Sequence, residues 1–255
     1  ARPGEVEQPV RVELKVDTGM ARLGVTIIAL AALAAALADY PEVEIGALMT
    51  HLASAESAEA TTEQMVLFDE ATALLARHGI RSPMRHAANS AALFQEEARL
   101  DAVRPGIAIF GVSPQTGGNA LADDLRLVMR VRTEIVSLRD VPAGSPVGYG
   151  ALFRPARDAR IATIPMGYAD GLSRALTNVG HVLVRGKRAP IVGAVSMDMT
   201  MIDVTDVDGV QLRDEAVVLG AQESPLGQDA IGADDIAQAI GTIPWEVLTA
   251  VSRRV

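Results

Sequence analysis

The stretch "EVEIGALMTHLAS" (Glu42–Ser54), followed closely by "TTEQMVLFDEATALLARHG" (Thr61–Gly79), decides the fold. The first segment is an apolar run that opens into polar residues, a pattern typical of a buried strand. The second begins on threonine and ends on glycine, which are start and stop signals of a helix. One strand–loop–helix unit is therefore predicted here.

Similar units flank this one. "RVELKV" (11–16) alternates apolar and polar residues like a strand, and "VTIIALAALAAALADY" (25–40) predicts a packed helix. That helix is too short and too rich in alanine for a membrane span of about 20 residues. "MRHAANSAALF" (84–94) and "RPGIAIFGVSP" (104–114) are interpreted as shorter strand–turn units. Repetition of this kind predicts a parallel α/β sheet or barrel.

The character of the sequence changes after about Asn119. The residues beyond it form β-branched runs separated by glycine and proline turns, at 125–141, 159–168, 181–205 and 214–220. Two helices are predicted to follow, at 232–241 and 243–254. We expect a boundary near residues 115–125, dividing an α/β part (1–118) from a mostly β part (119–255).

Composition limits the partners and the compartment. The 255 residues carry a net charge of −9, which argues against nucleic acid or an anionic membrane as the main partner. Cysteine is absent, which excludes disulfides and thiolate metal sites and is compatible with a reducing cytoplasm. The first residues lack the pattern of a signal peptide. We therefore expect a cytoplasmic protein without a metal site.

Polar side chains follow successive predicted strands, and strand ends of a parallel barrel converge on one face. Each of them alone has a simpler interpretation, such as a core histidine, a helix cap or a turn. Four strand ends with compatible groups make coincidence a poor explanation, and a site is predicted from Asp17, Thr18, Arg22, His51, Asn89, Ser90 and Arg104.

Seven segments, in this order, resemble the alanine racemases: "LKVDTGMARLGV", "MTHLASAE", "RHAANSAA", "VRPGIAIFGVSP", "VGYGALF", "IPMGYADGLSR" and "VGAVSMDMTMIDV". The resemblance implies pyridoxal 5′-phosphate as cofactor and a (β/α)8 barrel, of which 1–118 would supply the last four strands, followed by a mostly β domain. The implied reaction interconverts L-alanine and D-alanine by two-base proton transfer at Cα. It would supply D-alanine for cell-wall peptidoglycan.

The resemblance also implies catalytic roles. Tyr149 matches the tyrosine that acts as acid and base in the partner subunit's site, so a homodimer is expected. Arg104 would donate to the pyridine nitrogen, with His51 supporting it. Guanidinium keeps its proton, so the ring nitrogen would stay largely unprotonated and the ring would be a weaker electron sink. Return of the proton to Cα is then favoured over transamination.

Further residues match the cofactor and substrate sites of the family. Ser90 with the backbone of Gly106 and Ile107 corresponds to the phosphate cradle, and Asn89 is a weaker candidate beside it. Arg22 corresponds to an arginine near the cofactor's phenolic oxygen and the substrate carboxylate. On the partner's side, Met197 would offer its backbone amide to that carboxylate, Tyr168 would line the entrance and Asp198 would help to shape it.

Lys15 is one of only two lysines in the chain. It matches a lysine that many family members carry as a carbamate, which would accept from Arg22. An unmodified ammonium would repel a neighbouring guanidinium, so carbamylation is the expected state. The alternative is a surface lysine without a role, and Lys187 is interpreted as a solvated turn residue.

Two family features are not found in this sequence. The first is the motif of the lysine that forms the Schiff base with the cofactor, and the second is the "P-R-x-Y" stretch expected after Val255. Because half a barrel exposes strand edges, we expect a fragment or split-gene product that needs its other half. A non-catalytic dimerisation remnant and a serine or broad-specificity racemase remain alternatives. A related decarboxylase is disfavoured, since such enzymes place an acid at the pyridine nitrogen.

Overall fold

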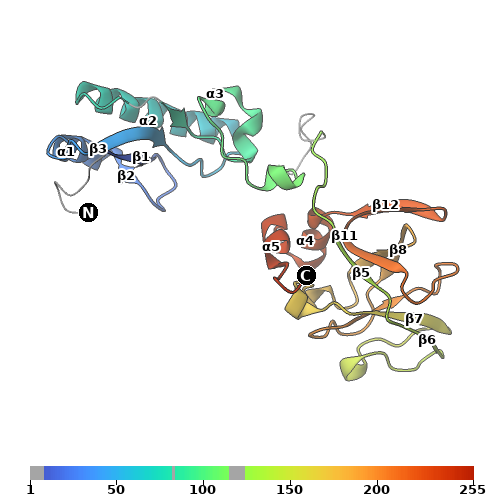
Figure 1. Ribbon diagram of the computed structural model, residues 1–255. Helices are drawn as coiled ribbons and strands as arrows, with labels where there is room; N and C mark the ends of the chain where they lie inside the picture. Colours follow the sequence, from blue (N-terminus) through green and yellow to red (C-terminus); the bar gives the residue numbers. More distant parts are fainter. Residues whose placement is uncertain (1–8, 82–83, 115–123) are drawn as a thin grey trace. The chain divides into compact units, whose positions relative to one another are not determined.

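The computed structural model describes residues 9–81, 84–114 and 124–255 (Figure 1). The chain divides into two compact units: Ala1–Ile109 with Ser113–Leu125, and Phe110–Val112 with Arg126–Val255. The boundary predicted between 118 and 119 falls outside the described residues and stays a prediction.

A parallel sheet forms the centre of the first unit, as predicted. Its strands run in the order β2-β1-β3-β4, and each is parallel to its neighbour. A further parallel bridge joins His86 to Ala102 beyond β4. The strands are β1 (Val10–Asp17), β2 (Val25–Thr26), β3 (Val43–Met49) and β4 (Arg85–His86).

Two longer helices, α1 (Ile27–Leu37) and α2 (Ala58–Arg77), belong to this unit. The helix α2 begins three residues before its predicted start, because the hydroxyl of Ser57 caps it by accepting from the Ala60 amide at 3.2 Å. It ends as predicted before Gly79, whose φ of +78° suits glycine. The buried face of α2 consists of Thr61, Gln64, Met65, Phe68, Ala71 and Leu75.

One expected strand is a short helix instead. Residues 104–114 were predicted to hold a strand, but Ile107–Phe110 forms a 3₁₀ helix. The Ser90 hydroxyl accepts from the amides of Gly106 (2.7 Å) and Ala108 (3.4 Å), which folds the chain into a turn before any strand can extend. The strand-like bridge occurs earlier, at Ala102, so Arg104 follows a strand position rather than opening one. Two other short helices of this unit are Ala91–Phe94 and α3 (Glu96–Arg99).

The second unit is mostly β, as predicted, and contains two antiparallel sheets. One sheet has the order β10-β7-β6, and the other β12-β11-β8-β9 with β5 also paired to β11. The strands are β5 (Val131–Glu134), β6 (Ser137–Val141), β7 (Ala159–Ile164), β8 (His181–Val184), β9 (Lys187–Pro190), β10 (Thr200–Asp203), β11 (Glu215–Ser224) and β12 (Gly227–Ile231).

Helices α4 (Ala233–Ile240) and α5 (Pro244–Ala250) follow the sheets at the predicted places. The strand β12 was not predicted, because its sequence "GQDAI" has little β propensity. A hairpin that pairs Ser224 with Gly227 forces it into register with β11. Within the described ranges of both units, no helix combines the length and the apolar character needed to span a membrane.

Candidate functional site

The guanidinium of Arg104 joins the ends of two strands of the first unit, β3 and β4. Its Nη1 lies 2.6 Å from Nδ1 of His86, and its Nη2 donates to the carbonyl oxygens of Thr50 (2.8 Å) and Ala87 (2.9 Å). The same Nη2 lies 3.3 Å from Nδ1 of His51. Arg104 and His51, which the sequence predicted to share a site, therefore lie together.

Both histidines are held neutral by their surroundings. Burial lowers the pKa of His51, and the positive charges of Arg104, Arg22 and Lys15 lower it further. Burial and Arg104 also lower the pKa of His86, against an opposing effect of Glu13. Since arginine only donates, each Nδ1 acts as acceptor and each ring proton belongs on Nε2.

His86 was not among the residues predicted from the sequence. It is 4% exposed, and its Nε2 lies 3.4 Å from Oε2 of Glu13, a contact that is not a hydrogen bond. Both residues lie within the quoted strand segments, and the sequence signal was the position of His86 at the end of a short strand. Because that histidine binds Arg104 directly, it belongs to the same cluster.

A buried polar network supports the loop that carries His51. The hydroxyls of Thr18 and Thr50 are 2.7 Å apart, and Nε2 of Gln64 donates to Thr18 at 3.0 Å. The same amide nitrogen donates to the His51 carbonyl at 3.3 Å, while Oε1 of Gln64 accepts from the Ala53 amide at 2.7 Å. Gln64 of α2 thus connects the ends of β1 and β3.

The residues predicted for phosphate binding are adjacent to one another. Ser90 is 6% exposed, and its hydroxyl accepts from the Gly106 amide, so that amide is already engaged. Ile107 directly follows Gly106 at the start of the 3₁₀ helix. Asn89 caps the short helix Ala91–Phe94 that follows it, because its Oδ1 accepts from the amides of Ala91 (3.1 Å) and Ala92 (3.2 Å). A helix cap therefore explains Asn89 without a ligand.

Lys15 and Arg22 both lie within electrostatic reach of His51, whose pKa they lower. Lys15 is half-buried near the end of β1, and Arg22 is exposed in the following loop. No hydrogen bond or ion pair joins these two side chains in the described part of the chain. The predicted partnership between them stays a prediction.

The second unit brings its four predicted residues together. Tyr149, Tyr168, Met197 and Asp198 line one hollow of about 500 Å³. Tyr149 is 76% exposed, so its phenol is open to a partner molecule. Arg174 lines the same hollow and was not predicted, although it ends the quoted segment "IPMGYADGLSR".

Backbone hydrogen bonds hold the two loops of this hollow against each other. The Tyr168 amide donates to the Ser196 carbonyl at 3.0 Å, and the Ala169 amide donates to the Met197 carbonyl at 3.0 Å. Gly167 permits this approach, since a Cβ there would lie 2.2 Å from the Ser196 oxygen. These bonds thus fix the positions of Tyr168 and Met197 relative to each other.

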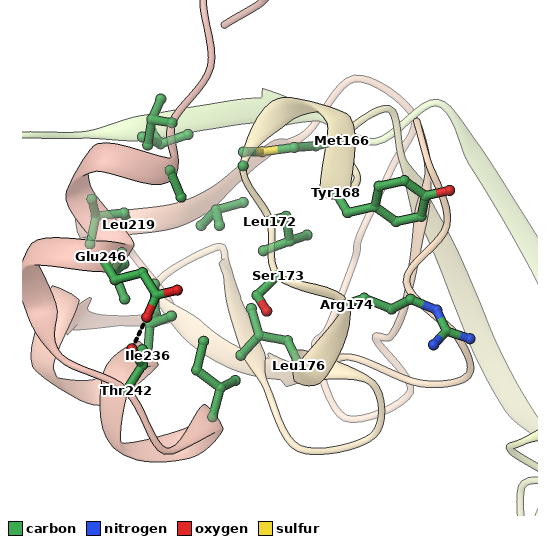
Figure 2. Close-up of a pocket in the computed structure, with 17 residues that line it drawn as sticks. Met166, Tyr168, Leu172, Ser173, Arg174, Leu176, Leu219, Ile236, Thr242 and Glu246 are labelled. Atoms are coloured by element: carbon green, nitrogen blue, oxygen red, sulfur yellow. Dashed lines mark hydrogen bonds between the residues drawn. The ribbon is translucent and has the colours of Figure 1, made fainter.

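An apolar pocket of about 340 Å³ lies behind the loop that carries Tyr168. Leu172 and Leu176 face this pocket from the loop, and Ile236 faces it from α4 (Figure 2). Tyr168 and Arg174 point away from its centre (Figure 2). One loop therefore borders both spaces: Leu172 and Leu176 face the pocket, and Tyr168 and Arg174 also line the hollow.

A parallel α/β unit with a partly buried arginine–histidine cluster, followed by an antiparallel β unit, is typical of proteins with a barrel domain and a β domain. Comparison with family models identifies the member of that class. "Alanine racemase, N-terminal domain" matches residues 2–114, and "Alanine racemase, C-terminal domain" matches 128–255. The chain belongs to the alanine racemase family, which depends on pyridoxal phosphate.

Similar proteins agree with this assignment. The chain is 54% identical over 249 residues to an alanine racemase of Sorangium cellulosum, covering 96% of this chain and 65% of that protein. A Bacillus anthracis alanine racemase crystal structure with bound L-Ala-P aligns with a TM-score of 0.86 and 32% identity, over 97% and 64% of the two chains. A Bartonella henselae alanine racemase with covalently bound pyridoxal phosphate aligns with a TM-score of 0.81 and 33% identity, over 96% and 65%. The chain thus spans about two thirds of the length of these relatives.

Proposed function

We propose that this chain takes part in the interconversion of L-alanine and D-alanine with pyridoxal phosphate. The observation that carries the proposal is the position of the Arg104 guanidinium, fixed at the ends of β3 and β4 by the Thr50 and Ala87 carbonyls and by His86. Strand ends of this kind are where parallel barrels bind ligands. Family membership supplies the reaction class.

The residues present fit this cofactor. The Ser90 hydroxyl accepts from two amides, so its own proton is free to bind a phosphate oxygen. Arg104 uses Nη1 and Nη2 in its hydrogen bonds to described residues, which leaves Nε–H for the pyridine nitrogen. Bound pyridoxal phosphate withdraws electrons from the substrate and weakens its Cα–H bond.

Arg104 favours racemisation through its permanent proton. Burial lowers the pKa of Arg104, but guanidinium starts so high that it stays a donor, so a pyridine nitrogen bound beside it would stay unprotonated. The neutral His51 and His86 accept from Arg104 and hold it in one orientation. Return of the proton to Cα, which gives racemisation, would then be favoured over transamination.

Tyr149 would serve the partner subunit in a homodimer. Its exposure of 76%, together with that of Met197 (53%) and Met199 (51%), supports a surface that a second copy covers. There the phenol would exchange a proton with one face of Cα. Met197 would offer its amide to the substrate carboxylate, while Tyr168 and Asp198 would border the entrance.

Lys15 would act as a carbamate that accepts from Arg22 and orients it toward the cofactor. Both positive charges lie near His51, so converting one ammonium into an anion would remove a repulsion. Incubation with ¹³C-labelled bicarbonate tests this by NMR. A carbamate signal that is absent from a Lys15→Arg variant supports the role, and an identical signal in both proteins contradicts it.

Deuterium exchange at the Cα of alanine is the test of the whole proposal. Because the chain is expected to need the other half of the barrel, exchange is measured in protein assembled with that half and pyridoxal phosphate. There L-alanine should exchange in D₂O, and Arg104→Gln should reduce this exchange at least about a hundredfold. The matched control is Arg99→Gln, an exposed arginine in α3. Borohydride reduction followed by peptide mapping would show whether Lys15 binds the cofactor.

Two outcomes would count against the proposal. Exchange that is equal in the Arg104 and Arg99 variants would remove Arg104 from the reaction. No exchange and no cofactor spectrum would make the chain a non-catalytic module. Serine in place of alanine distinguishes a broader racemase, and the use of D-alanine for peptidoglycan and a cytoplasmic location stay predictions.

A further inference from the structure

The second unit contains an arginine that binds two acidic residues from different loops. Nη2 of Arg254 donates to Oδ1 of Asp198 at 2.7 Å, and its Nε lies 3.3 Å from Oδ1 of Asp170. Asp198 belongs to the Met197 loop of the hollow, and Asp170 closes the turn that begins at Gly167 and includes Tyr168. One guanidinium therefore bridges the two loops described above.

Asp170 is the better buried of the two acids. Its side chain is 10% exposed, against 51% for Asp198, and its Oδ2 accepts from the Gly167 amide at 2.9 Å. A buried carboxylate needs partners for both oxygens, because an unpaired charge is costly away from water. Gly167 satisfies one oxygen and Arg254 the other.

The backbone before Arg254 also packs on this turn. The Ser252 amide donates to the Asp170 carbonyl at 3.1 Å. A Cβ at Gly171 would lie 2.4 Å from the Ala250 oxygen, and its φ of +106° also favours glycine. The segment 250–254 thus lies in direct contact with the Tyr168 turn, and its position fixes Arg254.

We infer that Arg254 is a positioning residue for the substrate entrance: it holds the Tyr168 turn and the Met197–Asp198 loop in one arrangement. It also neutralises Asp198, the acidic residue that lines the hollow. Arg174, the basic residue that lines it, has no acidic partner among the described residues, so the charge left in the hollow is positive. A hollow with an unpaired positive charge attracts a carboxylate, such as the carboxylate of an amino acid substrate. The entrance role rests on the proposed function, whereas the bridge between the loops does not.

Hydrogen exchange of the Tyr168 and Ala169 amides measures the bridge directly, because these amides donate across the two loops. In Arg254→Gln their exchange should become about threefold to tenfold faster, as expected for losing a charge-assisted bond at a partly exposed site. Arg254→Lys should recover only part of the protection, since one ammonium cannot replace two separated nitrogens. Arg253→Gln, an exposed neighbour, is the control and should match the unaltered chain.

Unchanged exchange at both amides in Arg254→Gln would overturn the inference. If that variant unfolds, which the fluorescence of the single tryptophan, Trp245 in α5, would reveal, Asp198→Asn replaces it. This variant keeps the Asp170 contact, and faster exchange confined to the two loops is expected. If exchange in Asp198→Asn were unchanged in the two loops, or faster by the same factor throughout the chain, the inference would also be overturned.

Kinetics test the entrance role separately. In protein that racemises alanine, Arg254→Gln should raise KM about threefold to tenfold with little change in kcat, because entrance geometry affects substrate capture more than chemistry. An equal fall in kcat with unchanged KM would contradict the entrance role. An inactive chain whose amides still respond would reject the proposed function and leave the bridge intact.

Discussion

Nη1 of Arg104 lies 2.6 Å from Nδ1 of the buried His86, and this pair links the end of β4 to the residue that we propose to face the cofactor. The contact requires a neutral imidazole, because a protonated ring offers no acceptor. The cluster therefore depends on pH.

Acidification below pH 6.5, the ordinary pKa of histidine, should lower the free energy of unfolding. Burial first, and then the charge of Arg104, lower the folded-state pKa of His51 and His86 from 6.5. The unfolded chain then binds more protons, so unfolding free energy is at its full value above 6.5 and falls as pH decreases toward the lowered values.

Urea denaturation between about pH 7.5 and about pH 5.5 measures this effect. His86→Gln should flatten the pH dependence, whereas His181→Gln, at an exposed position in β8, should not. A slope that is the same in both variants would contradict the role assigned to His86.

Gln64→Ala should cost about 1–3 kcal/mol of unfolding free energy, since it leaves the Ala53 amide without its acceptor and Thr18 without a donor. Chemical denaturation measures the loss. Glu63→Ala, its exposed neighbour in α2, should change stability by less than about 0.5 kcal/mol. Equal effects of the two variants would show that the buried network contributes nothing specific.

Phe68→Ala should cost about 3–5 kcal/mol, because Phe68 is fully buried between α2 and the sheet. Arg85 also lies over its ring, 5.1 Å from the centroid. Thermal unfolding followed by circular dichroism measures the change, and Val66→Ala, at 53% exposure, should cost less than about 1 kcal/mol. A small loss at Phe68 would mean that this core tolerates a cavity.

Tyr149→Phe should abolish proton exchange at one face of alanine Cα and leave cofactor binding unchanged, because it removes only a phenolic oxygen. Exchange started from each enantiomer in D₂O distinguishes the two faces. Tyr40→Phe is a control tyrosine at 45% exposure in the first unit. Racemisation at the unaltered rate would exclude Tyr149 as an acid or base.

The fold was predictable where local pattern and tertiary pairing agree. The parallel order of β1, β3 and β4 follows from strand–helix repetition, and α2 ends where Gly79 ends it. The strand expected at Ile107–Phe110 was wrong, because Ser90 is separated by many residues from the amides it binds and no local pattern reveals that bond. β12 was missed for a different reason, since its pairing with β11 across a tight hairpin outweighs its composition.

The candidate site was predictable only in part. Strand ends indicated Arg104 and His51, and the quoted motifs indicated Tyr149 and Met197. His86 and Arg254 depended on side-chain directions that spacing does not determine, since their partners lie at distant positions in the chain. Long-range side-chain contacts of this kind become visible only in three dimensions.

The hydrogen bonds of Arg104 also constrain how this family member can evolve. Active-site residues are often destabilising, so replacing them usually trades function for stability. Here the side chain binds the carbonyls of Thr50 and Ala87 at 2.8 Å and 2.9 Å. A lineage that lost the need for catalysis would therefore gain no stability by discarding Arg104, and selection for folding alone would retain it.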